Sequence, residues 1–379
     1  MVRIKTMISQ GLARPDSLSV RVLSAALIPL WLAVTGTTQA GTTTIDPLEI
    51  PAPTLAQPLA APLISIARAG DVLVSVGLRG LIQRSHDNGT SWEQVSSPVS
   101  SDFVQVRFSD ARNGWIVGHD SVVLHSSDAG ATWAVQMDGR KLLSLLGGVY
   151  GQRAEQGDQE AADLVQEVNR AVTTSATPDV IPAPLLDVLF DASGRGFVVG
   201  AFGMILRSDD AGSTWQPWLE RADNPRRMHL YGLAERNGTF YISGEQGMLL
   251  RLEPGQQRFE KIETPYTGTY FGVAAFEHLL LAYGLRGNLF ASVDDGQQWQ
   301  QIETGIDTSL VSIVEQGPAL IMVSQGGQLV SVDRQRLKVA ALVQTREGDV
   351  YAASATKQPG RLVVARFAGA KVIDIARAN

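Results

Sequence analysis

Short apolar runs on either side of a glycine turn recur along the chain. Six of these runs align, and they read VSVGLRGLIQRS from Val74, WIVGHDSVVLHS from Trp115, FVVGAFGMILRS from Phe197, YISGEQGMLLRL from Tyr241, LAYGLRGNLFAS from Leu281 and IMVSQGGQLVSV from Ile321. Runs of four or five residues rich in β-branched side chains are typical of strands, and a glycine between them can supply the positive φ of a tight turn. The pattern therefore predicts six β-hairpins in series.

A second signature, S-x-D-x-G-x-x-W, follows most of these hairpins. Its clearest copies are RSHDNGTSW (Arg84 to Trp92), HSSDAGATW (His125 to Trp133), RSDDAGSTW (Arg207 to Trp215) and ASVDDGQQW (Ala291 to Trp299). Trp92 and Trp133 are 41 residues apart, whereas Trp133 and Trp215 are 82 apart, so a stretch about one repeat long separates the second and third copies. A degenerate copy begins at Arg251 and carries Phe259 in place of the tryptophan.

The residue types of this signature suit a structural turn. An aspartate can accept backbone N–H bonds from the residues that follow it, the glycine tolerates the left-handed conformation, and the tryptophan packs the next strand against its neighbour. We assign these structural roles to Asp87, Gly89, Trp92, Asp128, Gly130, Trp133, Asp210, Gly212, Trp215, Asp294, Gly296 and Trp299. Calcium binding is the alternative, but each turn offers one carboxylate where calcium usually gathers six to eight oxygens.

Repeats of about forty residues, each with four strands, are typical of a β-propeller. A seventh, weaker unit starts at Leu342 and continues from Arg361 without the tryptophan. We therefore predict an all-β fold, a seven-bladed β-propeller of four-stranded antiparallel blades over residues 61–379. Strand-like runs exclude an α-solenoid.

Residues 138–184 lack the repeat and are predicted to form a partly helical insertion between blades 2 and 3. From Asp158 to Val172, apolar residues recur at the i, i+3, i+4, i+7 spacing of an amphipathic helix. Leucines between positions 142 and 146 add apolar surface that must be covered. Two interpretations stay open: the helix packs against the rim of the propeller, or it is a partner-binding arm or lid that uses Leu164 and Val168.

The first forty residues have the features of a cleaved signal peptide. Four basic residues precede an apolar run from Val22 to Val34, and Ala40 ends a stretch of small residues. A membrane anchor is the alternative, but the run is shorter than the ~20 apolar residues that a bilayer needs, and Pro29 interrupts it. We expect residues 1–40 to be removed, an extended segment at 41–60, and a periplasmic protein with no transmembrane segment.

Composition narrows the chemistry. The chain has no cysteine, which excludes disulfides, thiolate metal ligands, cysteine nucleophiles and a lipid-anchored N-terminal cysteine. The net charge of −6 becomes −9 without residues 1–40, so nucleic acid is not an expected partner. The five histidines show no metal-ligand spacing, and no phosphate loop or G-x-S-x-G elbow occurs. We expect no metal and no cofactor.

The run from Val198 to Trp215 resembles the repeat of the BNR (Asp-box) propellers, and most of all that of the photosystem II stability and assembly factor family. The Asp-box alone is shared with sialidases, and the G-x-x-G turn before it favours the assembly factors. The resemblance implies an exported, non-enzymatic, seven-bladed propeller that acts as a chaperone or scaffold in membrane-protein assembly. The chain lacks the lipid-modified cysteine of cyanobacterial members and the twin-arginine leader of plastid members. It therefore resembles a bacterial, non-photosynthetic member serving an envelope complex, with an exporter as one candidate client.

Blade geometry sorts the loops into two faces. In a four-stranded blade the B–C and D–A connections share one face, and the A–B and C–D connections share the other. The G-x-x-G turns are B–C connections, so they should ring one opening of the channel together with an arginine-rich D–A connection at residues 220–229. The candidate partner-binding residues on this face are Arg79, His119, Phe202, Arg221, Arg226, Arg227, Glu245 and Arg286, with Asp120, Gln246 and Gln325 beside them.

A non-catalytic scaffold or assembly factor is the favoured function, because folding accounts for every strong motif and chemistry for none. No catalytic residue is assigned. A glycan-binding or sialidase-like glycosidase propeller is the alternative, and it would need a glutamate–tyrosine pair in the channel mouth with converging arginines. A carrier that holds a small ligand in the channel is the third hypothesis.

Overall fold

The structure, a computed structural model, describes residues 46–56, 60–175, 177–342 and 348–375, which fall into one compact unit. The predicted signal peptide at residues 1–40 and the start of the segment expected at 41–60 lie outside the described residues.

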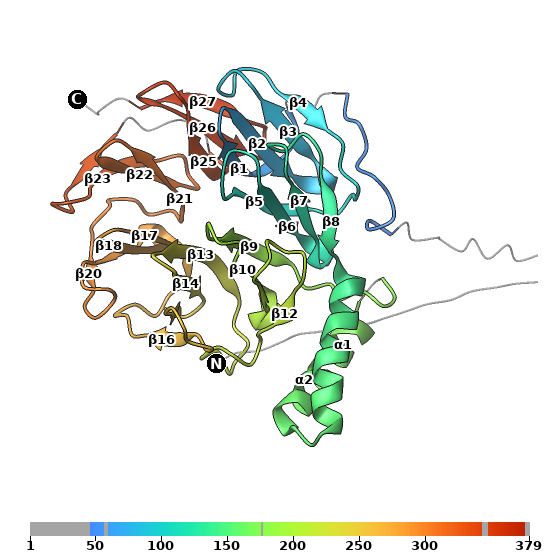
Figure 1. Cartoon of the computed structure of the whole chain (residues 1–379). Coiled ribbons are helices and arrows are strands. Elements are labelled where there is room, and N and C mark those ends of the chain that lie inside the picture. Colours follow the sequence, from blue (N-terminus) through green and yellow to red (C-terminus); the bar gives the residue numbers. More distant parts are fainter. Residues whose placement is uncertain (1–45, 57–59, 176, 343–347, 376–379) are drawn as a thin grey trace, which may run out of the picture. The chain divides into compact units, whose positions relative to one another are not determined.

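Seven antiparallel sheets follow one another along the chain (Figure 1). The first three blades are β1 (Leu63–Ala69), β2 (Val72–Gly77), β3 (Ile82–Ser85) and β4 (Glu93–Val95); β5 (Phe103–Phe108), β6 (Gly114–Gly118), β7 (Val123–Ser126) and β8 (Ala134–Met137); and β9 (Leu185–Phe190), β10 (Gly196–Gly200), β11 (Ile205–Ser208) and β12 (Gln216–Pro217). In each blade the strands pair in the order in which they occur along the chain. We call the strands of a blade A, B, C and D, from the first to the last.

The remaining blades repeat this order. They are β13 (Leu230–Arg236), β14 (Thr239–Gly244), β15 (Leu249–Leu252) and β16 (Glu260–Ile262); β17 (Tyr270–Phe276), β18 (Leu279–Gly284), β19 (Leu289–Ser292) and β20 (Gln300–Gln301); β21 (Leu310–Gln316), β22 (Ala319–Ser324), β23 (Leu329–Asp333) and β24 (Val339–Ala341); and β25 (Val350–Ala355), β26 (Arg361–Arg366) and β27 (Lys371–Asp374). The seven-bladed propeller predicted from the repeat is confirmed, with three strands in the seventh blade among the described residues.

The core lies between neighbouring blades. Every B strand is almost wholly buried, and each contributes apolar side chains to the clusters on its two sides. Seven such clusters occur among the described residues, one for each pair of adjacent blades, including the pair formed by blade 7 and blade 1. Polar contacts reinforce this last junction, where Nη2 of Arg68 donates to the carbonyl oxygen of Ala355 at 2.6 Å. Burial between blades therefore closes the ring.

The described part of the N-terminal segment runs beside blade 1. The backbone N–H of Ala52 donates to the carbonyl of Ser97 at 3.2 Å, and that of Leu55 donates to Oε1 of Gln94 at 2.9 Å. The segment thus extends the outer edge of the first blade before the chain enters β1.

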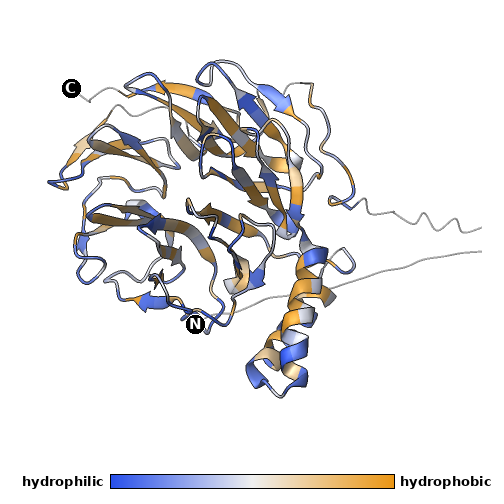
Figure 2. Ribbon diagram, in the orientation of Figure 1, coloured by the Kyte–Doolittle hydropathy of each residue, from blue (hydrophilic) through white to orange (hydrophobic). Residues whose placement is uncertain are grey.

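Two helices form the insertion between blades 2 and 3, α1 (Gly139–Glu155) and α2 (Gln159–Thr173). Asp158 caps α2 by accepting the backbone N–H of Ala161, so the helix predicted from Asp158 to Val172 is confirmed to within a residue. The first helix was not predicted. Asp138 starts it by accepting the backbone N–H groups of Arg140 and Lys141. The two helices lie side by side (Figure 1), with apolar residues along both (Figure 2).

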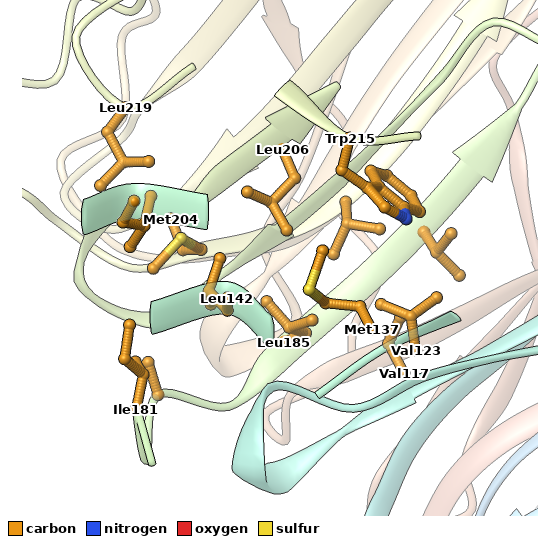
Figure 3. Packing of buried hydrophobic residues seen from close by; sticks show 14 of the residues in the cluster. Val117, Val123, Met137, Leu142, Ile181, Leu185, Met204, Leu206, Trp215 and Leu219 are labelled. Carbon is orange, nitrogen blue, oxygen red and sulfur yellow. The ribbon is translucent and has the colours of Figure 1, made fainter. Parts of the chain in front are cut away.

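The helices share their core with the propeller. Leu142 and Leu146 of α1 and Leu164 of α2 are buried in the cluster that also joins blades 2 and 3. Figure 3 shows Leu142 among Leu185 and Met204 of blade 3. This packing supports the interpretation that the insertion lies against the rim of the propeller.

Candidate functional site

The B–C turns of five blades each place one side chain on the same face, and four of these five side chains are exposed while Asp120 is half-buried. In these turns the residue before the second glycine has a left-handed backbone: Arg79, Asp120, Phe202, Gln246 and Arg286. The second glycine is also left-handed, as expected, but Ser121 replaces it in blade 2. The first glycine is extended, so the positive φ expected of a glycine in this turn is supplied by the second one. All five side chains are thereby held at the tips of rigid turns.

A cavity of about 460 Å³ opens on this face between the helical insertion and blade 3. Its floor is apolar, from Leu146, Leu164, Val168, Ile181, Met204 and Leu219. Phe202 stands at its edge and is 56% exposed, although it is a large apolar side chain. We call this cavity and its edge the groove. It brings together the predicted Leu164, Val168, Phe202, Arg226 and Arg227.

The arginines at the edge of the groove are neutralised unequally. Arg227 donates to the carbonyl of Leu219 at 2.6 Å and lies 3.4 Å from the carboxylate of Glu167. Arg226 donates to Oε1 of Gln246 at 2.7 Å, and Arg170 donates to the carbonyl of Gln166. Within the described part of the chain, no carboxylate lies in ion-pairing distance of Arg170 or Arg226. Two cations therefore border an apolar cavity in a protein of negative net charge.

A buried ionic network fixes the helical insertion beside the groove. Glu220 accepts the Tyr150 hydroxyl at 2.6 Å and pairs with Arg153, which also contacts Asp158 at 2.8 Å. Burial alone would raise the pKa of Glu220, but the bonds from Tyr150 and Arg153 outweigh it and hold that pKa below its usual value. Burial, followed by the bond to Glu220, raises the pKa of Tyr150. The network ties the end of α1 and the start of α2 to the loop that carries Arg226.

The other predicted partner-binding residues do not join the groove. Arg79, His119 and Arg286 are exposed on the B–C turns of blades 1, 2 and 5. Arg221 lies over the Trp218 ring at 5.1 Å and is not among the residues that line the groove. The predicted candidates are therefore spread over the face of the B–C turns, and only Leu164, Val168, Phe202, Arg226 and Arg227 meet in the groove.

Glu245 lies between the groove and the centre of the ring. Its carboxylate accepts the backbone N–H of His229 at 2.9 Å and lies 3.5 Å from the hydroxyl of Tyr231. Burial first, and then the charge of Glu245, raises the pKa of Tyr231. This is a glutamate–tyrosine pair near the channel mouth, the arrangement that a sialidase-like reading would need.

The channel itself encloses a cavity of about 620 Å³ lined by the A strands. Arg107 holds Asp187 with two contacts of 2.7 and 2.6 Å, and Asp187 also accepts the backbone N–H of Leu233 at 2.7 Å. Arg68, the other arginine among the described lining residues, is bound to the carbonyl of Ala355. Burial raises the pKa of Tyr283 to about 12. No three arginines converge on the Tyr231–Glu245 pair in the described part of the molecule.

The C–D turns on the opposite face have the geometry that their sequence suggests. In blade 2, Asp128 accepts the backbone N–H of Thr132 at 2.9 Å and its hydroxyl at 2.6 Å, while Gly130 has a φ of 79°. The Trp133 ring N–H donates to the carbonyl of Gly130 at 3.1 Å. Asp87, Asp210 and Asp294 each accept the corresponding backbone N–H, at 2.8 to 2.9 Å. Across residues 46–375, gaps excepted, no group of three or more acidic or histidine side chains could hold a metal.

Several groove residues escaped sequence reasoning. Leu146 was noted as apolar surface, but the helix that carries it was not predicted. Met204 directly follows the G-x-x-G turn of blade 3 without having been singled out, and Ile181 belongs to a loop with no distinctive pattern. Arg170 stands at the end of the predicted amphipathic helix, and its proximity to Arg226 in the sequence-distant loop could not be foreseen.

A sequence model of the family described as "Photosynthesis system II assembly factor YCF48" matches residues 68–146. The chain is 26% identical over 184 residues to the chloroplastic photosystem II stability/assembly factor HCF136 of Oryza sativa subsp. japonica, covering 45% of this chain and 39% of that protein. It is 25% identical over 264 residues to HCF136 of Arabidopsis thaliana, covering 60% and 63%. The matches thus span less than two thirds of each relative.

Solved structures show the same fold. YCF48 bound to a D1 peptide has a TM-score of 0.58 at 15% identity and covers 87% of this chain and 100% of that one. YCF48 from Cyanidioschyzon merolae has a TM-score of 0.52 at 14% identity, covering 86% and 98%. The chain therefore has the fold of these propellers and is similar to photosystem II assembly factors over part of its length.

Proposed function

We propose that this protein is a non-catalytic, periplasmic scaffold or assembly factor that binds a protein partner from a membrane or envelope complex. The observation that carries the proposal is the groove, where a large exposed phenylalanine and two arginines without carboxylate partners border an apolar floor. An apolar cavity with a charged edge suits a protein segment that offers an apolar side chain and an acidic group.

The comparisons support a role in assembly. The two HCF136 relatives are named as stability/assembly factors, and one of the similar structures is YCF48 bound to a D1 peptide. The identity of the client complex for this chain, an exporter included, is part of the proposal. Among the residues described, no helix is long and apolar enough to cross a membrane.

Export to the periplasm rests on the leader-like sequence of residues 1–40. Fractionation of cells that carry a C-terminally tagged protein tests it. We expect a shortened protein in the periplasmic fraction, and an uncleaved protein in the cytoplasm would contradict export.

Binding is tested by affinity purification from the envelope fraction. The double variant Arg170→Gln/Arg226→Gln removes the two cations and leaves the apolar floor intact. We expect it to recover at least ten times less of the partner that the wild type recovers, because charged groups at a binding edge are matched by opposite charges. Arg112→Gln, an exposed arginine at the opposite face, is the matched control and should recover the wild-type amount.

The Tyr231–Glu245 pair makes a sialidase-like glycosidase the second candidate. A tyrosine nucleophile needs a lowered pKa, whereas that of Tyr231 is raised, and Arg107 is held by Asp187. We therefore expect no hydrolysis of a synthetic sialoside. Turnover that disappears in Tyr231→Phe would replace our proposal with the glycosidase.

A further inference from the structure

Every A strand of the propeller carries one extra residue directly after its first. In blade 2, Phe103 pairs with Gly118 and Gln105 with Val117, so Val104 has no partner of its own. The same shift occurs in the other six blades at the corresponding position. The seven extra residues are Ile64, Val104, Leu186, Tyr231, Phe271, Val311 and Tyr351. A β-bulge of this kind re-aims a side chain.

The first glycine of the B–C turn packs closely against the start of the A strand in the first five blades. It pairs with the first residue of the A strand in five blades, and its α-carbon faces the carbonyl just before that strand. A Cβ on Gly118 would lie 2.2 Å from the carbonyl oxygen of Asp102, and one on Gly77 would lie 1.9 Å from that of Pro62. The glycine thus allows the close approach of the two strands beside the bulge in five blades, whereas Ser324 and Arg366 take its place in blades 6 and 7.

The seven bulge residues share one chemistry. All are apolar or aromatic, all are half-buried, and they come from the same end of seven A strands. Five of them line the central cavity, while Tyr231 and Phe271 contact each other with ring centroids 5.5 Å apart. We call these seven residues the collar. A ring of uncharged, partly exposed side chains at a cavity mouth is apolar surface that water solvates poorly.

An aromatic row connects the collar to the groove. The ring of Phe202 lies 5.0 Å from that of His229, which lies 6.3 Å from Tyr231, the collar residue in contact with Phe271. The cations Arg170 and Arg226 lie at the groove end of this row, and the uncharged collar lies at the other. The row therefore runs from two cations at the groove, past the carboxylate of Glu245 beside His229 and Tyr231, to uncharged side chains at the collar.

We propose that the collar receives a bulky apolar side chain of the protein segment whose acidic part lies in the groove. The inference rests on the proposed function, because it names a second contact for the same partner. A protein segment is favoured over a free lipophilic molecule because the aromatic row links the collar to the groove, so one extended chain can contact both. The polar layer below the collar, where Gln105 and the Arg107–Asp187 pair lie, sets the depth that the side chain reaches.

An uncharged pentapeptide with a central 4-fluorophenylalanine, Ac-Gly-Gly-Phe(4-F)-Gly-Gly-NH2, tests the collar by ¹⁹F NMR titration. We expect saturable binding to the wild-type protein and at least fivefold weaker binding to Val104→Ser/Val311→Ser, which makes the collar polar. Val104→Trp, which fills the mouth without removing apolar surface, should weaken binding as well. Val293→Ser removes a lone apolar side chain that is 67% exposed on the opposite face, and it should bind as the wild type does.

Circular dichroism first establishes that each variant is folded. Equal binding by the wild type and both Val104 variants would overturn the inference, and so would saturable binding of decanoate with none of the peptide. If the peptide fails while the envelope partner is still recovered in a manner dependent on Arg170 and Arg226, the collar assignment is wrong and the proposed function stands. If both fail, the proposed function fails with it.

Discussion

The aspartates of the C–D turns show how one residue type stabilises a repeated turn. Asp128 accepts three hydrogen bonds, from the backbone and hydroxyl of Thr132 and from the hydroxyl of Ser126. Burial alone would raise its pKa, but these bonds outweigh burial and lower it to about 2. The bonds from Ser91, followed by that from Ser85, lower the pKa of Asp87 to about 2 as well. The carboxylates are therefore bound in their ionised form.

This binding predicts an acid dependence of stability. The pKa of Asp128 is about 2 in the folded protein and about 3.9 in an unfolded chain. Its hydrogen bonds therefore stabilise the fold fully at pH values above about 3.9, and this contribution is lost as pH falls through about 2. In urea unfolding, the wild type should exceed Asp128→Asn in stability by about 1–2 kcal/mol at pH 6, and the gap should shrink towards pH 2. A gap that does not change with pH would show that the charge of Asp128 plays no part.

The first glycines of the B–C turns give a second prediction. A Cβ at Gly118 would collide with backbone, so Gly118→Ala should destabilise the protein by about 1–3 kcal/mol. Gly148 lies exposed in α1 with no atom near a Cβ, and Gly148→Ala should stabilise by about 0.5–1 kcal/mol because alanine favours the helix. Thermal unfolding measures both. Equal shifts of one sign would mean that close approach at Gly118 is unimportant.

For single residues, the sequence predicts the roles in the turns but not the β-bulges beside them. The aspartate and glycine roles follow from residue chemistry alone and could be assigned in advance. The bulges could not, because Val104 and Phe271 read as ordinary strand residues until the pairing of Gly118 and Gly284 is known.

Among the elements, the two helices of the insertion differ in how well the sequence reveals them. The apolar spacing of α2 is regular and Asp158 marks its start, so it was predicted. The first helix contains Gly147, Gly148 and Gly151, which weaken helix propensity. Its stability comes from packing of Leu142 and Leu146 against blade 3, and that is visible only in the fold.

The hydrogen bond from the Tyr150 hydroxyl to Glu220 links the helices to the loop after blade 3, and removing one oxygen atom breaks it. Tyr150→Phe removes the hydroxyl that donates to the ionised Glu220, and the protein should lose about 1.5–3 kcal/mol of local stability. Hydrogen–deuterium exchange should accelerate in α1 and α2 while blades 5 and 6 exchange as before. Faster exchange throughout the molecule, or no change in the helices, would contradict a local anchor.

For the whole molecule, the spacing of the tryptophans and the repeated hairpins was enough to predict seven blades and their strand order. The seventh blade has no tryptophan, and its place was inferred from strand spacing alone. What closes the ring is apolar burial between blade 7 and blade 1, with Arg68 reaching Ala355 across 287 positions of sequence. Contacts between residues so far apart in the sequence produce no repeating pattern from which they could be predicted. The groove could not be predicted for the same reason, because its residues come from an insertion, a turn and a loop.

The central claim is that the face of the B–C turns, at the groove, holds the partner. Site-specific photocrosslinking in living cells tests it most directly, with benzoylphenylalanine in place of Phe202 at the groove or Val293 on the opposite face, both exposed apolar positions. We expect an adduct with the purified partner from position 202, abolished by Arg170→Gln/Arg226→Gln, and none from position 293. Adducts with that partner from position 293 and none from 202 would contradict the account.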